Sequence, residues 1–174
     1  LLPFLKGDAD RAATALNAYF RRAQDIVHAY GGIINKVDMY THGDKLMVLF
    51  GAPVAHEDDP LRAVRCGLEL VDMLRAANDE IRPLIEAGRQ EPVESGSLPD
   101  VANQPAVEQI WQQPLRQRIG INSGTVFAGR LGGKERYEYS VLGPAVNLSS
   151  RLMEVSREDI VLLSPATRQT VARS

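Results

Sequence analysis

Cysteine is nearly absent from this 174-residue chain, which contains Cys66 alone. A single cysteine cannot close a disulfide within the chain or supply a thiolate cluster to a metal ion. This scarcity excludes a disulfide-stabilised secreted scaffold and a structural zinc module. It is typical of a protein from a reducing compartment, and we therefore expect a cytoplasmic location.

Net charge, aromatic residues and long apolar runs are also scarce. The formal net charge is −2 and aromatic residues make up 6% of the chain, so no basic, aromatic-rich surface for nucleic acid is expected. No apolar run approaches the ~20 residues that span a bilayer, so we expect no membrane contact from this chain. What is present is 44% hydrophobic residues, enough for one domain with a single core.

The first half of the chain shows two helical patterns around a hairpin. Apolar residues recur at helical spacing over residues 16–30, where Gly31-Gly32 is expected to end the helix, and again over residues 61–74, where Asp59-Pro60 provides a helix start. Between them, residues 33–37 and 45–50 resemble two strands of a hairpin whose connection is longer than a tight turn.

From about residue 79 to residue 114 the periodicity fails, and proline mixes with glutamine and glutamate, which indicates a flexible insertion. Strand-like runs then resume and are followed by a helix from Pro144 and a further strand at 159–163. This order favours an α+β fold, a ferredoxin-like two-layer sandwich with a mostly antiparallel sheet and helices packed on one face. We expect residues 1–174 to form a single domain.

Three stretches of the sequence carry a family resemblance: GDKLMVLFGAPVAHEDD at 43–59, RIGIN with the following SG at 118–124, and YSVLGPAVNLSSRL at 139–152. In this order they resemble class III adenylate and guanylate cyclases of bacterial type. The resemblance covers most of the chain except the insertion. It implies a nucleotide cyclase domain in a longer signalling protein, whose first strand and C-terminal hairpin would lie outside this chain.

The resemblance implies that two Mg²⁺ or Mn²⁺ ions assist the reaction. In the family two aspartates hold both ions, one on the first strand and one in the hairpin, where Asp44 stands in this chain. Carboxylate oxygens are the ligands that these ions prefer. The spacing from Lys36 to Asp44 is longer than is usual in the family, so Asp38 remains an alternative ligand in the same hairpin.

Purine recognition is implied for Lys36 and Ser140, which match the family's base-contacting positions. A lysine that donates to a ring nitrogen and a hydroxyl that accepts from an exocyclic amine together fit adenine. Guanylate cyclases usually carry glutamate and cysteine there. The resemblance therefore implies conversion of ATP to 3′,5′-cyclic AMP and pyrophosphate, with GTP as the alternative substrate.

Asn147 and Arg151 are four residues apart, which places them on one face of a helix. By resemblance, Asn147 orients the ribose and Arg151 stabilises charge that develops on the phosphoryl oxygens. Arg118 matches a family arginine that reaches the triphosphate, a role that suits a fixed guanidinium.

The resemblance also implies a homodimer in which both active sites lie at the interface, related by a two-fold axis. The alternative is a catalytically degenerate cyclase-fold module that binds nucleotide or dimerises and thereby regulates attached domains. The long hairpin beside Asp44 favours that alternative.

Overall fold

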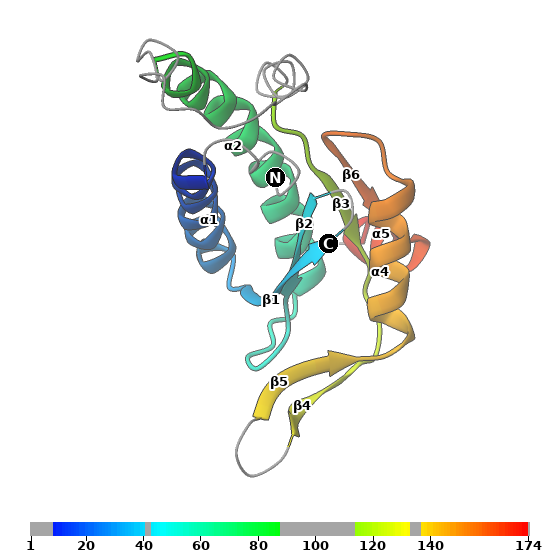
Figure 1. Ribbon diagram of the computed structural model, residues 1–174. Coiled ribbons are helices and arrows are strands. Elements are labelled where there is room, and N and C mark those ends of the chain that lie inside the picture. Colours follow the sequence, from blue (N-terminus) through cyan, green and yellow to red (C-terminus); the bar gives the residue numbers. More distant parts are fainter. Residues whose placement is uncertain (1–8, 41–42, 88–113, 133–136, 174) are drawn as a thin grey trace.

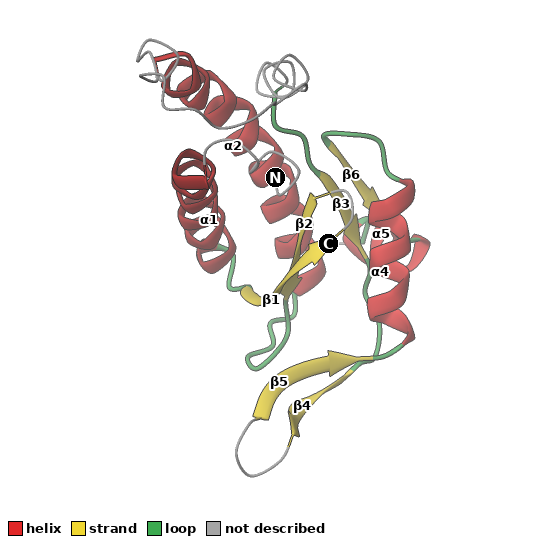
Figure 2. Cartoon of the chain, in the orientation of Figure 1, coloured by secondary structure: helices red, strands yellow, loops and turns green. Residues whose placement is uncertain are grey.

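The computed structural model describes residues 9–40, 43–87, 114–132 and 137–173. Figures 1 and 2 show a mixture of helices and short strands, which confirms the predicted α+β class. The elements in chain order are α1 Ala9–Ala29, β1 Ile33–Tyr40, β2 Gly43–Leu49, α2 Asp59–Ala87, β3 Arg118–Ile121, β4 Phe127–Gly132, β5 Tyr137–Leu142, α4 Pro144–Val155, β6 Ile160–Leu163 and α5 Pro165–Val171.

Helix α1 ends at a glycine pair, as the sequence predicted. The Gly31 amide donates to His28 O at 2.9 Å and the Gly32 amide donates to Val27 O at 2.9 Å, which is the Schellman pattern. Gly31 has a φ of 77°, a conformation that glycine adopts without steric cost. The chain therefore turns directly from α1 into β1.

Helix α2 begins where Asp59 predicts it. The carboxylate of Asp59 accepts from the His56 amide at 2.7 Å and lies 3.1 Å from the His56 Nδ1 atom, which fixes the loop before the helix. The sequence predicted a loop from about residue 79, but α2 continues to Ala87, so that boundary was wrong. The rest of the predicted insertion, residues 88–113, lies outside the described residues.

The described strands form three two-stranded sheets, β1–β2 and β4–β5 antiparallel and β3–β6 parallel. The pairing is mostly antiparallel, as predicted. The connection between β1 and β2 is shorter than predicted, because pairing continues to Tyr40 and Gly43 and leaves two residues between them. The extra residues of this hairpin therefore lengthen its strands.

Sheet β3–β6 lies between two helices. A Cβ built on Gly67 of α2 would lie 3.3 Å from the Ile121 side chain and 3.4 Å from Val161. A Cβ on Gly120 would lie 2.3 Å from Ser149 O, so the opposite face of β3 touches the backbone of α4. Only glycine permits an approach of that kind.

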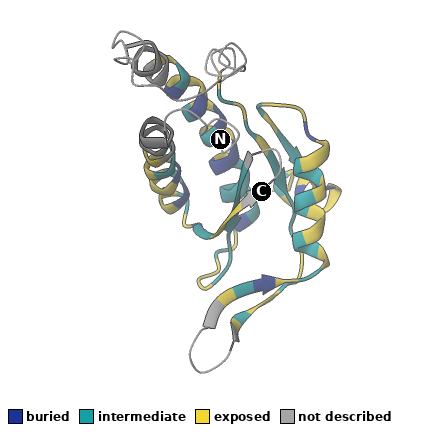
Figure 3. Cartoon of the chain, viewed as in Figure 1, coloured by how far each residue is buried: buried dark blue, intermediate teal, exposed yellow. Residues whose placement is uncertain are grey.

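The most buried apolar side chains come mainly from the packing of α1 against α2. They are Ala23, Val27, Cys66, Val71, Leu74 and Ala77, with Val141 of β5 as the exception. Figure 3 shows this burial along α2, and shows the β4–β5 hairpin extending away from the rest of the chain. Among the described helices, none is long and apolar enough to cross a membrane.

Candidate active site

The β1–β2 hairpin presents two of the predicted site residues on opposite faces. Lys36 pairs with Met47 across the hairpin, so these two side chains share one face. Asp44 is three residues before Met47, and alternation along β2 places it on the other face. The Lys36 and Asp44 side chains therefore project from opposite faces of the same hairpin.

Asp44 has a polar atom without a partner. Its Oδ2 atom is buried and accepts no hydrogen bond within the described part of the chain. A buried carboxylate oxygen without a donor is unfavourable, and a divalent cation would satisfy it, because Mg²⁺ and Mn²⁺ bind carboxylate oxygen. The residues present fit a metal ion in this respect, although the described residues hold no cluster of three or more acidic, histidine or cysteine side chains.

Asp38, the alternative ligand, has a different environment. Its carboxylate lies 3.3 Å from the Lys36 ammonium, and both side chains are about half exposed, at 49% and 47%. An exposed ion pair of this kind contributes little to stability. Asp38 is paired and exposed, whereas the buried Oδ2 atom of Asp44 has no hydrogen-bond partner among the described residues, so the geometry favours Asp44 as the candidate metal ligand.

The two predicted base-contacting residues lie on neighbouring strands. The Asn35 Nδ2 atom of β1 donates to Tyr139 O of β5 at 3.0 Å. Lys36 follows Asn35 and Ser140 follows Tyr139, so this bond brings together the backbone segments that carry the predicted pair, although Lys36 and Ser140 are 104 positions apart in the sequence. Sequence spacing alone could not predict that neighbourhood.

Helix α4 carries the two predicted catalytic residues on its surface. Gly143, with a φ of 150°, precedes Pro144 at the first turn, so the helix starts where the sequence predicted. Asn147 and Arg151 are exposed, and no residue of α4 is buried. The helix therefore presents both side chains to solvent or to a partner surface.

Lys45 links the metal-ligand strand to this helix. Its Nζ atom donates to the Ser150 hydroxyl, and that hydroxyl lies 3.5 Å from Glu154 Oε1. Lys45 follows Asp44, and Ser150 precedes Arg151. The contact sets the position of β2 relative to α4, between the candidate ligand and the candidate catalytic arginine.

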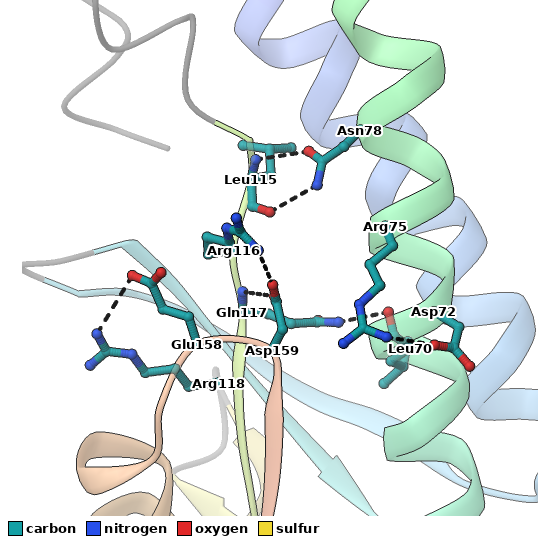
Figure 4. A network of polar contacts seen from close by, with 10 residues as sticks. All are labelled: Leu70, Asp72, Arg75, Asn78, Leu115, Arg116, Gln117, Arg118, Glu158 and Asp159. Atoms are coloured by element: carbon teal, nitrogen blue, oxygen red, sulfur yellow. Dashed lines mark hydrogen bonds and ion pairs between the residues drawn. The ribbon is translucent and has the colours of Figure 1, made fainter.

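Arg118 lies away from the other predicted residues. Strand β3 runs along α4 with Asn122 bonded to Ala145 O near the helix start, and Gly120 touches the backbone further along the helix. Arg118 is consequently near the end of α4, where its guanidinium lies 3.8 Å from Glu158, as Figure 4 shows. The structure does not bring Arg118 together with Asn147 in one chain.

A polar network fixes the segment that leads into β3. Asp159, with a φ of 57°, accepts from the Arg116 side chain and from the Gln117 amide, while its own amide donates to Gln117 O at 2.6 Å (Figure 4). The Gln117 side chain donates to Leu70 O, and Asn78 exchanges two hydrogen bonds with the Leu115 backbone. These contacts hold Arg118 in register beside α2.

Sequence reasoning missed the roles of Asn35, Lys45 and Asp159. Asn35 carried a signal, because it interrupts the apolar run before Lys36 in a strand. Lys45 and Asp159 carried none, since a lysine in a hairpin and an aspartate before a strand are ordinary surface residues. Their partners are distant in sequence.

Comparison with known proteins defines the family. Residues 5–174 match the family described as the adenylate and guanylate cyclase catalytic domain. The chain therefore belongs to the class III nucleotide cyclase domains, as the resemblance implied.

Individual relatives include cyclases named for either purine. Adenylate cyclase 1 of Rhizobium meliloti is 28% identical over 149 residues, which is 86% of this chain and 18% of that protein. The crystal structure of the guanylyl cyclase Cya2 is 29% identical with a TM-score of 0.70, covering 95% of this chain and 69% of that one. The adenylyl cyclase CyaB of P. aeruginosa, at 24% identity with a TM-score of 0.72, covers 97% and 72% and shows the same fold. The chain spans about a fifth of the curated relative.

Proposed function

We propose that this domain converts ATP to 3′,5′-cyclic AMP and pyrophosphate by attack of the ribose 3′-hydroxyl on the α-phosphate. The observation that carries the proposal is the neighbourhood of Lys36 and Ser140, set by the bond from Asn35 to Tyr139 O. An ammonium donor beside a hydroxyl acceptor suits the ring nitrogen and exocyclic amine of adenine. GTP would present a ring N–H, itself a donor, to the ammonium, and a carbonyl in place of the amine to the hydroxyl.

The remaining residues take roles that fit their chemistry. Asn147 orients the ribose, and Arg151 stabilises negative charge on the phosphoryl oxygens without changing its protonation state. Two Mg²⁺ or Mn²⁺ ions would supply charge neutralisation and favour loss of the 3′-hydroxyl proton, and Asp44 is the described residue that would hold them. Arg118 reaches the triphosphate from β3.

A homodimer with composite sites accounts for two features of the chain. Lys36 and Asp44 are on opposite faces of one hairpin, so a single nucleotide contacts one from each protomer. Large apolar side chains are also exposed on the elements that carry or adjoin the predicted site residues, namely Val37, Phe127, Leu142 and Leu148. Burial of such side chains stabilises association between protomers.

Direct assay of the full-length protein tests the proposal. The wild type with Mn²⁺ is expected to form cyclic AMP from ATP faster than cyclic GMP from GTP, and both Asp44→Ala and Arg151→Ala are expected to lower product formation by about 10²-fold or more. Absence of product from either nucleotide, in a protein shown to be dimeric, would contradict the proposal and favour a regulatory cyclase-fold module. The observation that favours this second function is the long β1–β2 hairpin that carries Asp44.

A further inference from the structure

Strand β1 contains one residue that has no partner in β2. Ile34 pairs with Val48 and Lys36 pairs with Met47, so Asn35 is the extra residue of a β-bulge. A bulge of this kind changes which face the following side chains occupy. Lys36 therefore lies on the same face of the hairpin as Met47. Simple alternation after Ile34 would have placed it on the opposite face.

The bulged residue makes a contact that joins two separate sheets. The β1–β2 and β4–β5 pairs are not hydrogen-bonded to each other as strands. The Asn35 side chain crosses between them and donates to Tyr139 O at 3.0 Å. Because the acceptor is a carbonyl oxygen, only the amide nitrogen of Asn35 can make this bond.

From these contacts we propose that Asn35 is a positioning residue that determines purine specificity. This inference rests on the proposed function, in which Lys36 and Ser140 contact the base. The Asn35 bond lies one residue before each of them and fixes the two strand segments from which the ammonium and the hydroxyl project. With those segments fixed, the pair matches the ring nitrogen and amine of adenine.

The bond itself is exposed, so its loss leaves the fold intact and acts on geometry. Asn35→Asp keeps the shape of the side chain but replaces its donor with a carboxylate, which repels the Tyr139 carbonyl. Asn35→Ala removes the side chain without adding repulsion. Both variants release β5 from β1, and both are expected to let Ser140 move relative to Lys36.

A matched control lies away from Lys36 and Ser140, on the side of the chain that leads into β3. The Asn78 amide donates to Leu115 O at 3.0 Å, so Asn78→Asp makes the same donor-to-carboxylate change at another carbonyl contact. This variant reports what loss of such a bond does to the fold in general. Asn78 bonds to Leu115, so its substitution is not expected to change the spacing between Lys36 and Ser140.

The decisive measurement is the ratio of kcat/KM for ATP to kcat/KM for GTP in the full-length protein. Asn35→Asp and Asn35→Ala are expected to lower this ratio by about five- to tenfold, the range expected for loss of one hydrogen bond. Asn78→Asp is expected to keep the wild-type ratio, even if its total activity falls. An unchanged ratio in both Asn35 variants of an active enzyme would overturn the inference and leave the proposed function standing.

Fluorescent ATP and GTP analogues separate the two proposals when the wild type forms no product. In that case the proposed function fails, and the ratio of the two dissociation constants replaces the kinetic ratio. A shift of this ratio in the Asn35 variants, but not in Asn78→Asp, would support the inference. Equal ratios in all variants, or no binding of either analogue, would overturn it.

Discussion

The α1–α2 side of the molecule and the α4 side differ in what they bury. Helices α1 and α2 supply nearly all of the most buried apolar side chains, among them Val27, Cys66 and Leu74. Helix α4 has no buried residue, yet it carries Asn147 and Arg151. The helices that supply the core and the helix that carries the two candidate catalytic residues are therefore different parts of the chain.

Stability and activity can therefore be changed independently in this chain. A buried side chain contributes free energy of unfolding through burial and packing. An exposed side chain on α4 contributes little to that free energy and is accessible to a ligand or a partner surface. Substitutions on the two sides should consequently separate in their effects.

The largest effect is expected from Arg151→Ala. Loss of a positioned charge at the phosphoryl group should lower kcat by about 10²- to 10³-fold. Because Arg151 is exposed, the melting temperature should stay close to that of the wild type. Steady-state kinetics with Mn²⁺ and ATP, together with thermal unfolding, measure both quantities. A marked loss of stability would show that Arg151 is structural.

Leu74→Ala tests the other side of the comparison. Leu74 is 3% exposed, and its truncation should lower the free energy of unfolding by about 2–5 kcal/mol. Activity per folded molecule should be retained, since Leu74 lies in the core between the helices. Denaturant unfolding and active-fraction kinetics check this, and an unchanged midpoint would contradict the assignment of the core to α1 and α2.

Lys45→Met tests the connection between β2 and α4. Loss of the hydrogen bond to Ser150 should lower stability by about 0.5–1.5 kcal/mol and should lower kcat through misplacement of Asp44. Arg75→Met, which removes an exposed pair with Asp72, is the matched control and should change neither quantity appreciably. If the losses of stability in Lys45→Met and Ser150→Ala simply add in the double variant, the two side chains are not energetically coupled, and the prediction is contradicted.

The remaining prediction concerns pH and lies outside this ranking of substitutions. Burial raises the pKa of the Cys66 thiol from 9.0 to about 12, and burial likewise raises the pKa of Tyr19 from 10.0 to about 12. The unfolded chain loses these protons at lower pH than the folded chain, so stability is full below pH 9 and falls as pH rises toward 12. Chemical unfolding between pH 8 and pH 11 measures this decline, and Cys66→Ala should reduce its slope. A stability that rises with pH would contradict the assignment.

The sequence predicted local structure well where one residue decides it. Gly31 ends α1, Asp59 begins α2 and Gly143 with Pro144 begins α4, because each meets a conformational or hydrogen-bonding requirement of a helix end. The predicted end of α2 was wrong, because the helix continues through Pro83, and proline usually ends a helix.

The candidate site was predictable as a set of residues and not as an arrangement. Motifs identified Asp44, Lys36 and Ser140, but the Asn35 bulge and the Lys45 contact with Ser150 arise from strands and helices that meet only in the folded chain. Register decides which face each side chain occupies, and one extra residue in β1 reverses it. Such a shift leaves no composition or periodicity signal.

The central claim is that each active site takes Asp44 from one protomer and Arg151 from the other. Mixing full-length Asp44→Ala with Arg151→Ala, after subunit exchange, tests this most directly. Each variant alone should be inactive, and the equimolar mixture should recover about a quarter of wild-type activity, because half of the dimers then hold one intact site. A mixture that stays inactive, with exchange verified, would contradict the composite site.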